Sequence, residues 1–267
     1  MKNNIYILFV LLIIQSCNSP QETVEIEDSR IIVYSQDSII TQHLQYIDSI
    51  VNIYDDVYAL PYDTLYLSMK KMKSRKVANG TATTLAHSEA GGSIAFNSNE
   101  VFPAGKDLRN IIVHELFHTL SPLQEDTTIF ERHYMLPNIS QRIVVYGYCD
   151  FALLGNIDDK GLGILTSMID EGAAEYCAFS LVSGYSISDP SYFNAGMTFK
   201  LLSNHGLIDP VSLSIYKKSA DLKGLLSHVL GREATRKDII DIGLLFMKIK
   251  IEEENANSVF EKILKLR

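Results

Sequence analysis

Two histidines and a glutamate lie within one apolar run, IIVHELFHTL, residues 111 to 120. On an α-helix, side chains four positions apart lie on one face, so His114 and His118 can bind the same cation. Glu115 cannot easily join that coordination shell, but it can reach a water in the fourth position of a zinc site. There it could accept a proton from a water whose pKa the metal lowers, and pass it to a leaving amine. The pattern predicts a metal-dependent hydrolytic centre.

A second acidic pair lies downstream in DEGAAEYC, residues 170 to 177. Glu171 and Glu175 are four positions apart on an expected helix, and the small residues between them would let another helix approach closely. Two carboxylates on one face repel each other unless a cation or an imidazole N–H lies nearby. We therefore expect Glu171 to be the third zinc ligand. Glu175 is expected to accept a hydrogen bond from the outer nitrogen of one histidine, which would fix its tautomer.

HELFH followed by an EGAAEY helix resembles the gluzincin branch of the zincin metallopeptidases, with motif support from about residue 90 to 180. The resemblance implies an α+β fold with a small, mostly antiparallel sheet, an active-site helix and a mainly helical C-terminal lobe. It implies a zinc-dependent peptidase in which His114, His118 and Glu171 bind Zn²⁺ and Glu115 is the general base. The 53 positions between His118 and Glu171 exceed the spacing of compact members. We expect an insertion there that serves as a lid or a substrate wall.

Peptide hydrolysis also needs a donor to the oxyanion of the tetrahedral intermediate. In gluzincins this donor is usually a Tyr or a His, and Tyr185, Tyr192 and His205 all follow the expected ligand helix. The sequence does not choose among them, and each is more often an ordinary core or surface residue. GGSIAFNS, residues 91 to 98, is expected to be the edge strand that binds extended substrate, although a plain turn explains its two glycines equally well.

Two other interpretations of these motifs stay open. The first is a zincin-like domain that binds zinc without catalysis and acts as a surface binding lipoprotein, which the lack of an identified oxyanion donor favours. The second is a metal-free helical adhesion or scaffold protein in which the HELFH pattern is accidental. Measured zinc content separates the second interpretation from the others.

The N-terminus predicts export to the bacterial envelope. Residues 5 to 14 are apolar, and this run of about ten is too short for a membrane-spanning helix, which needs about twenty, but is typical of a signal peptide. Residues 14 to 17 resemble a bacterial lipobox, which implies removal of residues 1 to 16 and acylation of Cys17. A plain signal peptide is the alternative. The polar residues 17 to 29 are expected to be a tether, and an outer-membrane lipid anchor is the favoured location.

The 267 residues, 46% of them hydrophobic, predict one folded unit from 30 to 267. Its mixed α/β lobe is expected to end at about residue 122, with a helical lobe after it. A formal charge of −8 argues against a nucleic-acid partner. The expected partners are a peptide or protein substrate, and a membrane only through the lipid. Cys149 and Cys177 could pair in an oxidising compartment or could be two buried thiols.

Hydrophobic periodicity predicts the elements that would position these residues. The basic stretch 70 to 76 is expected to be a solvated loop. Strands are expected at 30 to 35, 63 to 69, 81 to 87 and 92 to 98, and helices at 38 to 54, 108 to 120, 163 to 183, 191 to 204, 209 to 218, 220 to 230 and 235 to 266.

Overall fold

The computed structural model describes residues 24–25, 31–33, 38–72, 75–77, 80–82, 85–89, 92–98, 106–120, 159–181, 190–219, 221–251 and 253–267. The expected signal peptide, Cys17, Cys149 with most of the expected insertion, and Tyr185 lie outside these residues. Val24–Glu25 falls in the expected tether but is paired with Ile32–Val33 in the sheet, so the tether prediction is wrong at these two residues. No helix in the described ranges is long and apolar enough to cross a bilayer.

The described residues form a mixed sheet and a set of helices, which confirms the α+β class. The strands are β1 (Val24–Glu25), β2 (Ile31–Val33), β3 (Leu65–Lys70), β4 (Arg75–Val77), β5 (Gly80–Ala82), β6 (Ala86–Glu89) and β7 (Ser93–Asn97). The helices are α2 (Ser38–Tyr58), α3 (Lys106–Thr119), α6 (Asp159–Leu181), α7 (Pro190–Asn204), α8 (Pro210–Lys218), α9 (Leu222–Leu230), α10 (Arg236–Ile251) and α11 (Ala256–Leu264).

The main sheet has the strand order β1-β2-β3-β7-β6. The three central strands β2, β3 and β7 are parallel, and the outer strands β1 and β6 are antiparallel to their neighbours. The expectation of a mostly antiparallel sheet is therefore wrong. Parallel neighbours need a crossover connection, and α2 supplies one between β2 and β3.

Strand β7 was expected at the edge of the sheet, and this is also wrong. It lies between β3 and β6, and four of its five residues, from Ile94 to Asn97, are buried. A nearly continuous apolar run is typical of a strand covered on both faces. Gly92 precedes it with a φ of +82°, so the turn explains this glycine. Among the described strands, β1 and β6 are the two edges of the sheet, and β6 is the one beside β7.

The expected strand at 81 to 87 is two separate elements. Gly80–Ala82 pairs with Arg75–Val77 in a small two-stranded sheet, and Ala86–Glu89 joins the main sheet. The end of the basic stretch 70 to 76 is therefore part of a hairpin and not entirely a loop.

Helix α2 covers the sheet with one apolar stripe and extends four residues beyond its predicted end. Its buried side chains recur at helical spacing, as the sequence predicts. They are Leu44, Ile47, Ile50, Val51, Tyr54 and Tyr58.

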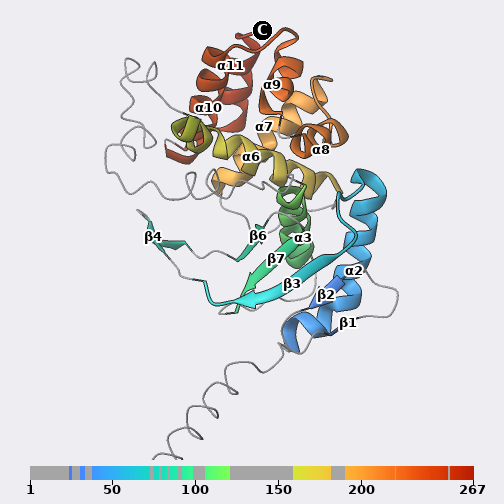
Figure 1. Ribbon diagram of the computed structural model, residues 1–267. Coiled ribbons are helices and arrows are strands. Elements are labelled where there is room, and N and C mark those ends of the chain that lie inside the picture. Colours follow the sequence, from blue (N-terminus) through green and yellow to red (C-terminus); the bar gives the residue numbers. More distant parts are fainter. Residues whose placement is uncertain are drawn as a thin grey trace, which may run out of the picture.

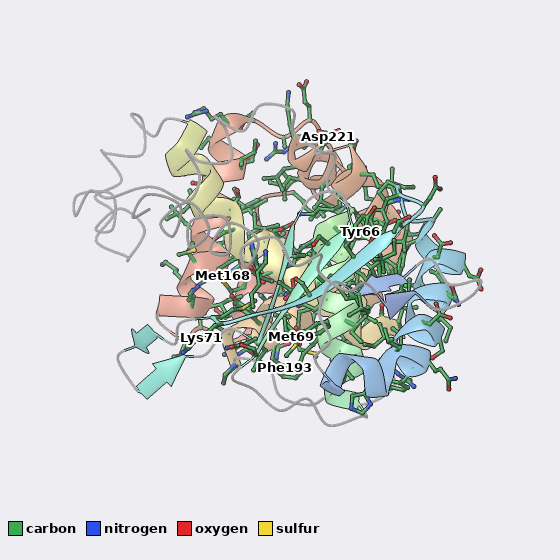
Figure 2. The ribbon with its side chains drawn as sticks, turned by 60° about the horizontal axis from the view of Figure 1, so that its bottom comes forward. Tyr66, Met69, Lys71, Met168, Phe193 and Asp221 are labelled. Carbon is green, nitrogen blue, oxygen red and sulfur yellow. The ribbon has the colours of Figure 1, made fainter. Side chains whose placement is uncertain are left out.

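The C-terminal helices gather on the opposite side of α3 from the sheet (Figure 1). Helix α6 lies between α3 and this group, and it packs against α3, α7 and α10. In Figure 2, turned so that the bottom of Figure 1 comes forward, side chains fill the space between strands and helices, and the fully buried Met168 of α6 lies among them.

The last predicted helix, 235 to 266, is broken into α10 and α11. Glu253 has a φ of +54°, which a right-handed helix cannot accommodate. Asn255 then caps α11, since its side chain accepts a hydrogen bond from the backbone N–H of Ser258 at 3.0 Å. The break lets α11 fold back against α10 and α7.

Candidate metal centre

Helix α3 presents two different faces. Its apolar side chains, among them Ile112, Leu116 and Phe117, are buried against the rest of the protein. His114 and His118 keep 12% and 17% of their side-chain surface exposed. The buried face therefore fixes the position of α3, and the two imidazoles project from the other face toward α6.

Helix α6 supplies the carboxylates and is held very close to α7. A Cβ atom at Gly172 would lie 2.9 to 3.1 Å from the backbone and Cβ of Ala195, and a Cβ at Gly196 would lie 2.9 Å from Cγ of Glu175. No side chain larger than a hydrogen fits these contacts without movement. This packing fixes the rotation of α6 and hence the direction of its carboxylates.

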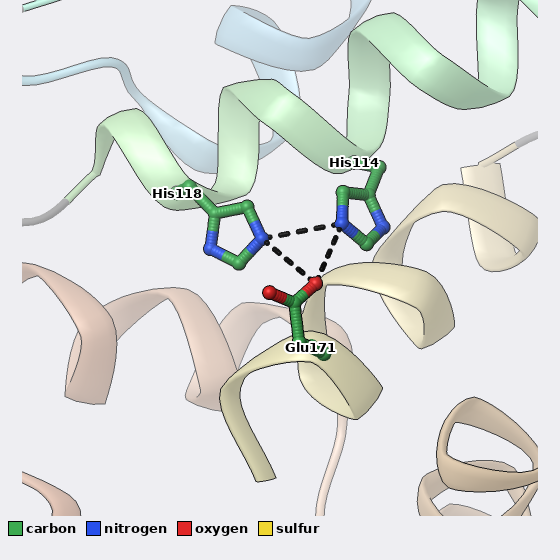
Figure 3. A group of neighbouring side chains, drawn as sticks. All are labelled: His114, His118 and Glu171. Atoms are coloured by element: carbon green, nitrogen blue, oxygen red, sulfur yellow. Dashed lines mark hydrogen bonds and ion pairs between the residues drawn. The ribbon is translucent and has the colours of Figure 1, made fainter. Parts of the chain in front are cut away.

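Three side chains from these two helices converge (Figure 3). Nε2 of His114 lies 3.1 Å from Oε2 of Glu171 and 3.2 Å from Nε2 of His118. Nε2 of His118 lies 3.5 Å from the same Glu171 oxygen. The three atoms thus form a nearly equilateral triangle.

The triangle fits a metal ion. Around a tetrahedral ion with bonds of 2.0 to 2.2 Å, neighbouring ligand atoms are about 3.3 to 3.6 Å apart. The observed separations of 3.1, 3.2 and 3.5 Å are close to those of one face of such a tetrahedron. His114, His118 and Glu171 therefore lie close enough to bind a metal ion, and within the described ranges no fourth His, Cys, Asp or Glu joins this group.

The outer nitrogen of His114 faces a second glutamate on α6. Nδ1 of His114 lies 3.2 Å from Oε2 of Glu175, whose side chain is only 6% exposed. On its other side, the ring of Tyr192 from α7 stacks nearly parallel to the imidazole, at 10° and 6.0 Å between centroids. His114 thus lies between the buried Glu175 and the partly buried Tyr192.

The outer nitrogen of His118 faces an aspartate. Nδ1 of His118 lies 3.0 Å from Oδ2 of Asp170. The other oxygen of Asp170 accepts a hydrogen bond of 2.5 Å from Nζ of Lys217 on α8. Lys217 also lies over the ring of Phe117, at 5.6 Å from its centroid. Residues from α3, α6 and α8 meet at this point.

These contacts change the affinity of the imidazoles for protons. Burial alone would lower the pKa of His118, but the charges of Asp170 and Glu171 outweigh it and raise that pKa to about 9. The pKa of His114 is also raised, because its hydrogen bonds to Glu171 and Glu175 outweigh burial. The pKa of Glu171 is held well below its ordinary value, despite burial, mainly by the charge of His118. The site attracts positive charge.

The structure also locates the remaining predicted residues. Glu115 is buried, and its negative charge contributes to the raised pKa of His114. Of the oxyanion donors, Tyr192 contacts the site, whereas His205 is exposed and packs on Phe260 of α11. His205 follows Tyr192 by 13 residues on and just past α7, which corresponds to about 20 Å. Tyr185 lies outside the described residues.

Asp170 and Lys217 were not predicted. Asp170 directly precedes the expected ligand Glu171, so an acidic pair was visible in the sequence. Lys217 lies 47 positions from Asp170, and only the packing of α8 against α6 and α3 brings them together. Cys177, for which a disulfide was one possibility, is a buried thiol on α6.

No family model, no curated protein and no solved structure matches this chain.

Proposed function

We propose that this chain is a zinc-dependent peptidase. The observation that carries the proposal is the triangle formed by Nε2 of His114, Nε2 of His118 and Oε2 of Glu171, with each imidazole bonded to a carboxylate through its other nitrogen. Imidazoles that bind metal usually donate their second N–H to such a partner, which fixes the tautomer.

Zinc is the ion that this donor set favours. Mg²⁺ and Ca²⁺ prefer oxygen ligands in larger coordination shells, whereas two imidazoles and one carboxylate around an open fourth position are typical of catalytic zinc. A zinc ion bound there would supply Lewis acidity, polarising a peptide carbonyl and lowering the pKa of water.

In this proposal Glu115 accepts a proton from the attacking water and delivers it to the leaving amine. Its position supports this role, because Glu115 directly follows the proposed ligand His114 on α3 and its negative charge acts on that imidazole. Tyr192 is the proposed oxyanion donor, since its ring lies against His114.

We propose further that substrate lies along β6. This strand has one neighbour among the described strands, β7, and it packs against α3. An extended peptide can add to such an edge through main-chain hydrogen bonds, and this would bring its scissile bond over the site helix. The proposed location is the bacterial cell envelope, with a lipid on Cys17 as the anchor.

The alternative is a zinc-binding surface lipoprotein without catalytic activity. Both proposals predict one bound zinc ion per chain, and only the peptidase predicts turnover.

The test compares wild-type protein with Glu115→Gln, loaded with zinc, on a diverse peptide library. Glu261→Gln, a change of the same kind at an exposed position on α11, is the matched control. The expected result is one zinc per chain in all three proteins, with kcat/KM reduced at least about 100-fold in Glu115→Gln alone. Full turnover by Glu115→Gln would overturn the assignment of the base. A zinc-loaded wild type that cleaves nothing would favour the binding lipoprotein.

A further inference from the structure

The two carboxylates behind the histidines are held in different ways. Glu175 is 6% exposed and packs against Gly196 of α7. Asp170 is 39% exposed, so packing leaves its carboxylate free to turn toward water. It nevertheless points at Nδ1 of His118, at 3.0 Å.

Lys217 accounts for this orientation. Its Nζ bonds to Oδ1 of Asp170 at 2.5 Å, which leaves Oδ2 for His118, so both bonds exist together. The lysine is itself restrained: its side chain is 16% exposed, and its ammonium lies over the Phe117 ring. A lysine held in this way has lost most of its rotamer freedom on folding and can define the position of its partner.

We propose that Lys217 is a positioning residue for the metal centre, acting through Asp170 to orient the imidazole of His118. This inference rests on the proposed zinc site, and it assigns to α8 a part in metal affinity although α8 supplies no ligand. The ion pair with Lys217 holds the Asp170 carboxylate in its orientation, whereas burial holds the Glu175 carboxylate.

The role is distinct from an ordinary stabilising ion pair. A structural pair would affect the free energy of unfolding of the metal-free protein and leave the relative affinity for zinc unchanged. If Lys217 positions the site, its removal lowers zinc affinity, because loss of a group that orients a metal ligand typically weakens metal binding 10-fold to 100-fold.

The experiment measures the Kd for Zn²⁺ by chelator competition in full-length protein. Lys217→Met keeps a long side chain but removes the charge, whereas Lys217→Arg keeps the charge. Lys223→Met is the control. Lys223 forms an exposed ion pair with Glu233 on the surface of the helical lobe, so this change also removes one lysine from an ion pair. We expect about a tenfold weaker Kd in Lys217→Met, recovery of most of the affinity in Lys217→Arg, and the wild-type value in Lys223→Met.

A double-mutant cycle with Asp170→Asn tests the route. If Lys217 acts through Asp170, the double variant binds zinc no more weakly than Asp170→Asn alone. Additive losses would overturn this route, and an unchanged Kd in Lys217→Met would overturn the role of Lys217 while leaving the zinc site intact. A wild type that binds no Zn²⁺ would instead remove the proposed centre itself. Circular dichroism of each variant, with Lys217→Arg as the conservative change, separates lost folding from lost affinity.

Discussion

His114 and His118 lie one turn apart on the same face of α3, yet their surroundings differ. His114 is enclosed by the buried Glu175 and by the stacked ring of Tyr192. His118 faces the more exposed Asp170, which an ionic bond to Lys217 holds in place. Two imidazoles on one helix face can therefore be oriented by packing in one case and by charge in the other. The two sides should respond differently to substitution and to pH.

The largest loss of zinc affinity is expected on substitution of Glu171, which lies between the two histidines. Glu171 lies within 3.5 Å of Nε2 of each histidine, so Glu171→Gln removes a charged ligand common to both. We expect zinc affinity to fall by more than about 100-fold, beyond the usual effect of losing an outer partner. Chelator competition measures this, with Glu261→Gln as the matched control. A Kd for Zn²⁺ equal to that of the wild type would show that Glu171 is not a ligand.

The comparison itself is tested by Glu175→Gln and Asp170→Asn. We expect Glu175→Gln to weaken zinc binding by about 100-fold and Asp170→Asn by about tenfold, the two ends of the range for outer partners. Water can replace the more exposed Asp170 carboxylate, whereas it cannot readily reach the place of the buried Glu175 carboxylate. Equal losses, or a larger loss at Asp170, would contradict the contrast between packing and charge.

The contrast also predicts a pH dependence of the metal-free protein. The folded pKa of His118 is about 9, above its ordinary value of 6.5. Its contribution to the free energy of unfolding is therefore fully present below pH 6.5 and is lost as the pH rises through about 9. Urea unfolding of metal-free protein between pH 6 and pH 10 measures this loss.

Asp170→Asn should flatten that pH profile, because the charge of Asp170 is the first cause that raises the pKa of His118. Glu175→Gln should leave the contribution of His118 in place, since Glu175 acts on His114. An identical profile in wild type and Asp170→Asn would count against the ion pair at His118.

The sequence predicted the parts of the site that depend on one helix. His114 and His118 share a face because they are four positions apart, and the same spacing relates Glu171 to Glu175. The small residues between Glu171 and Glu175 predicted the close approach of another helix, and Gly172 does lie at such a contact, with α7.

What the sequence could not predict depends on packing between distant segments. The pairing of β7 with both β3 and β6 is decided by the sheet as a whole, and no local pattern in residues 92 to 98 specifies it. The contact of Asp170 with Lys217 depends in the same way on where α8 packs. The break before α11 had a local cause in Asn255, but the apolar periodicity continued across it.

The close contacts of Gly172 and Gly196 bear on how small a functional unit this centre can be. Shifting α6 by one residue would turn its side chains by about 100° and take Glu171 away from the imidazoles. Helix α7 prevents that shift, because its Ala195 fits against Gly172 and its own Gly196 fits against Glu175 of α6, although none of the three clustered residues belongs to α7. Anyone who transplants the centre onto another scaffold would therefore have to carry over α7, and α8 with Lys217, in addition to α3 and α6.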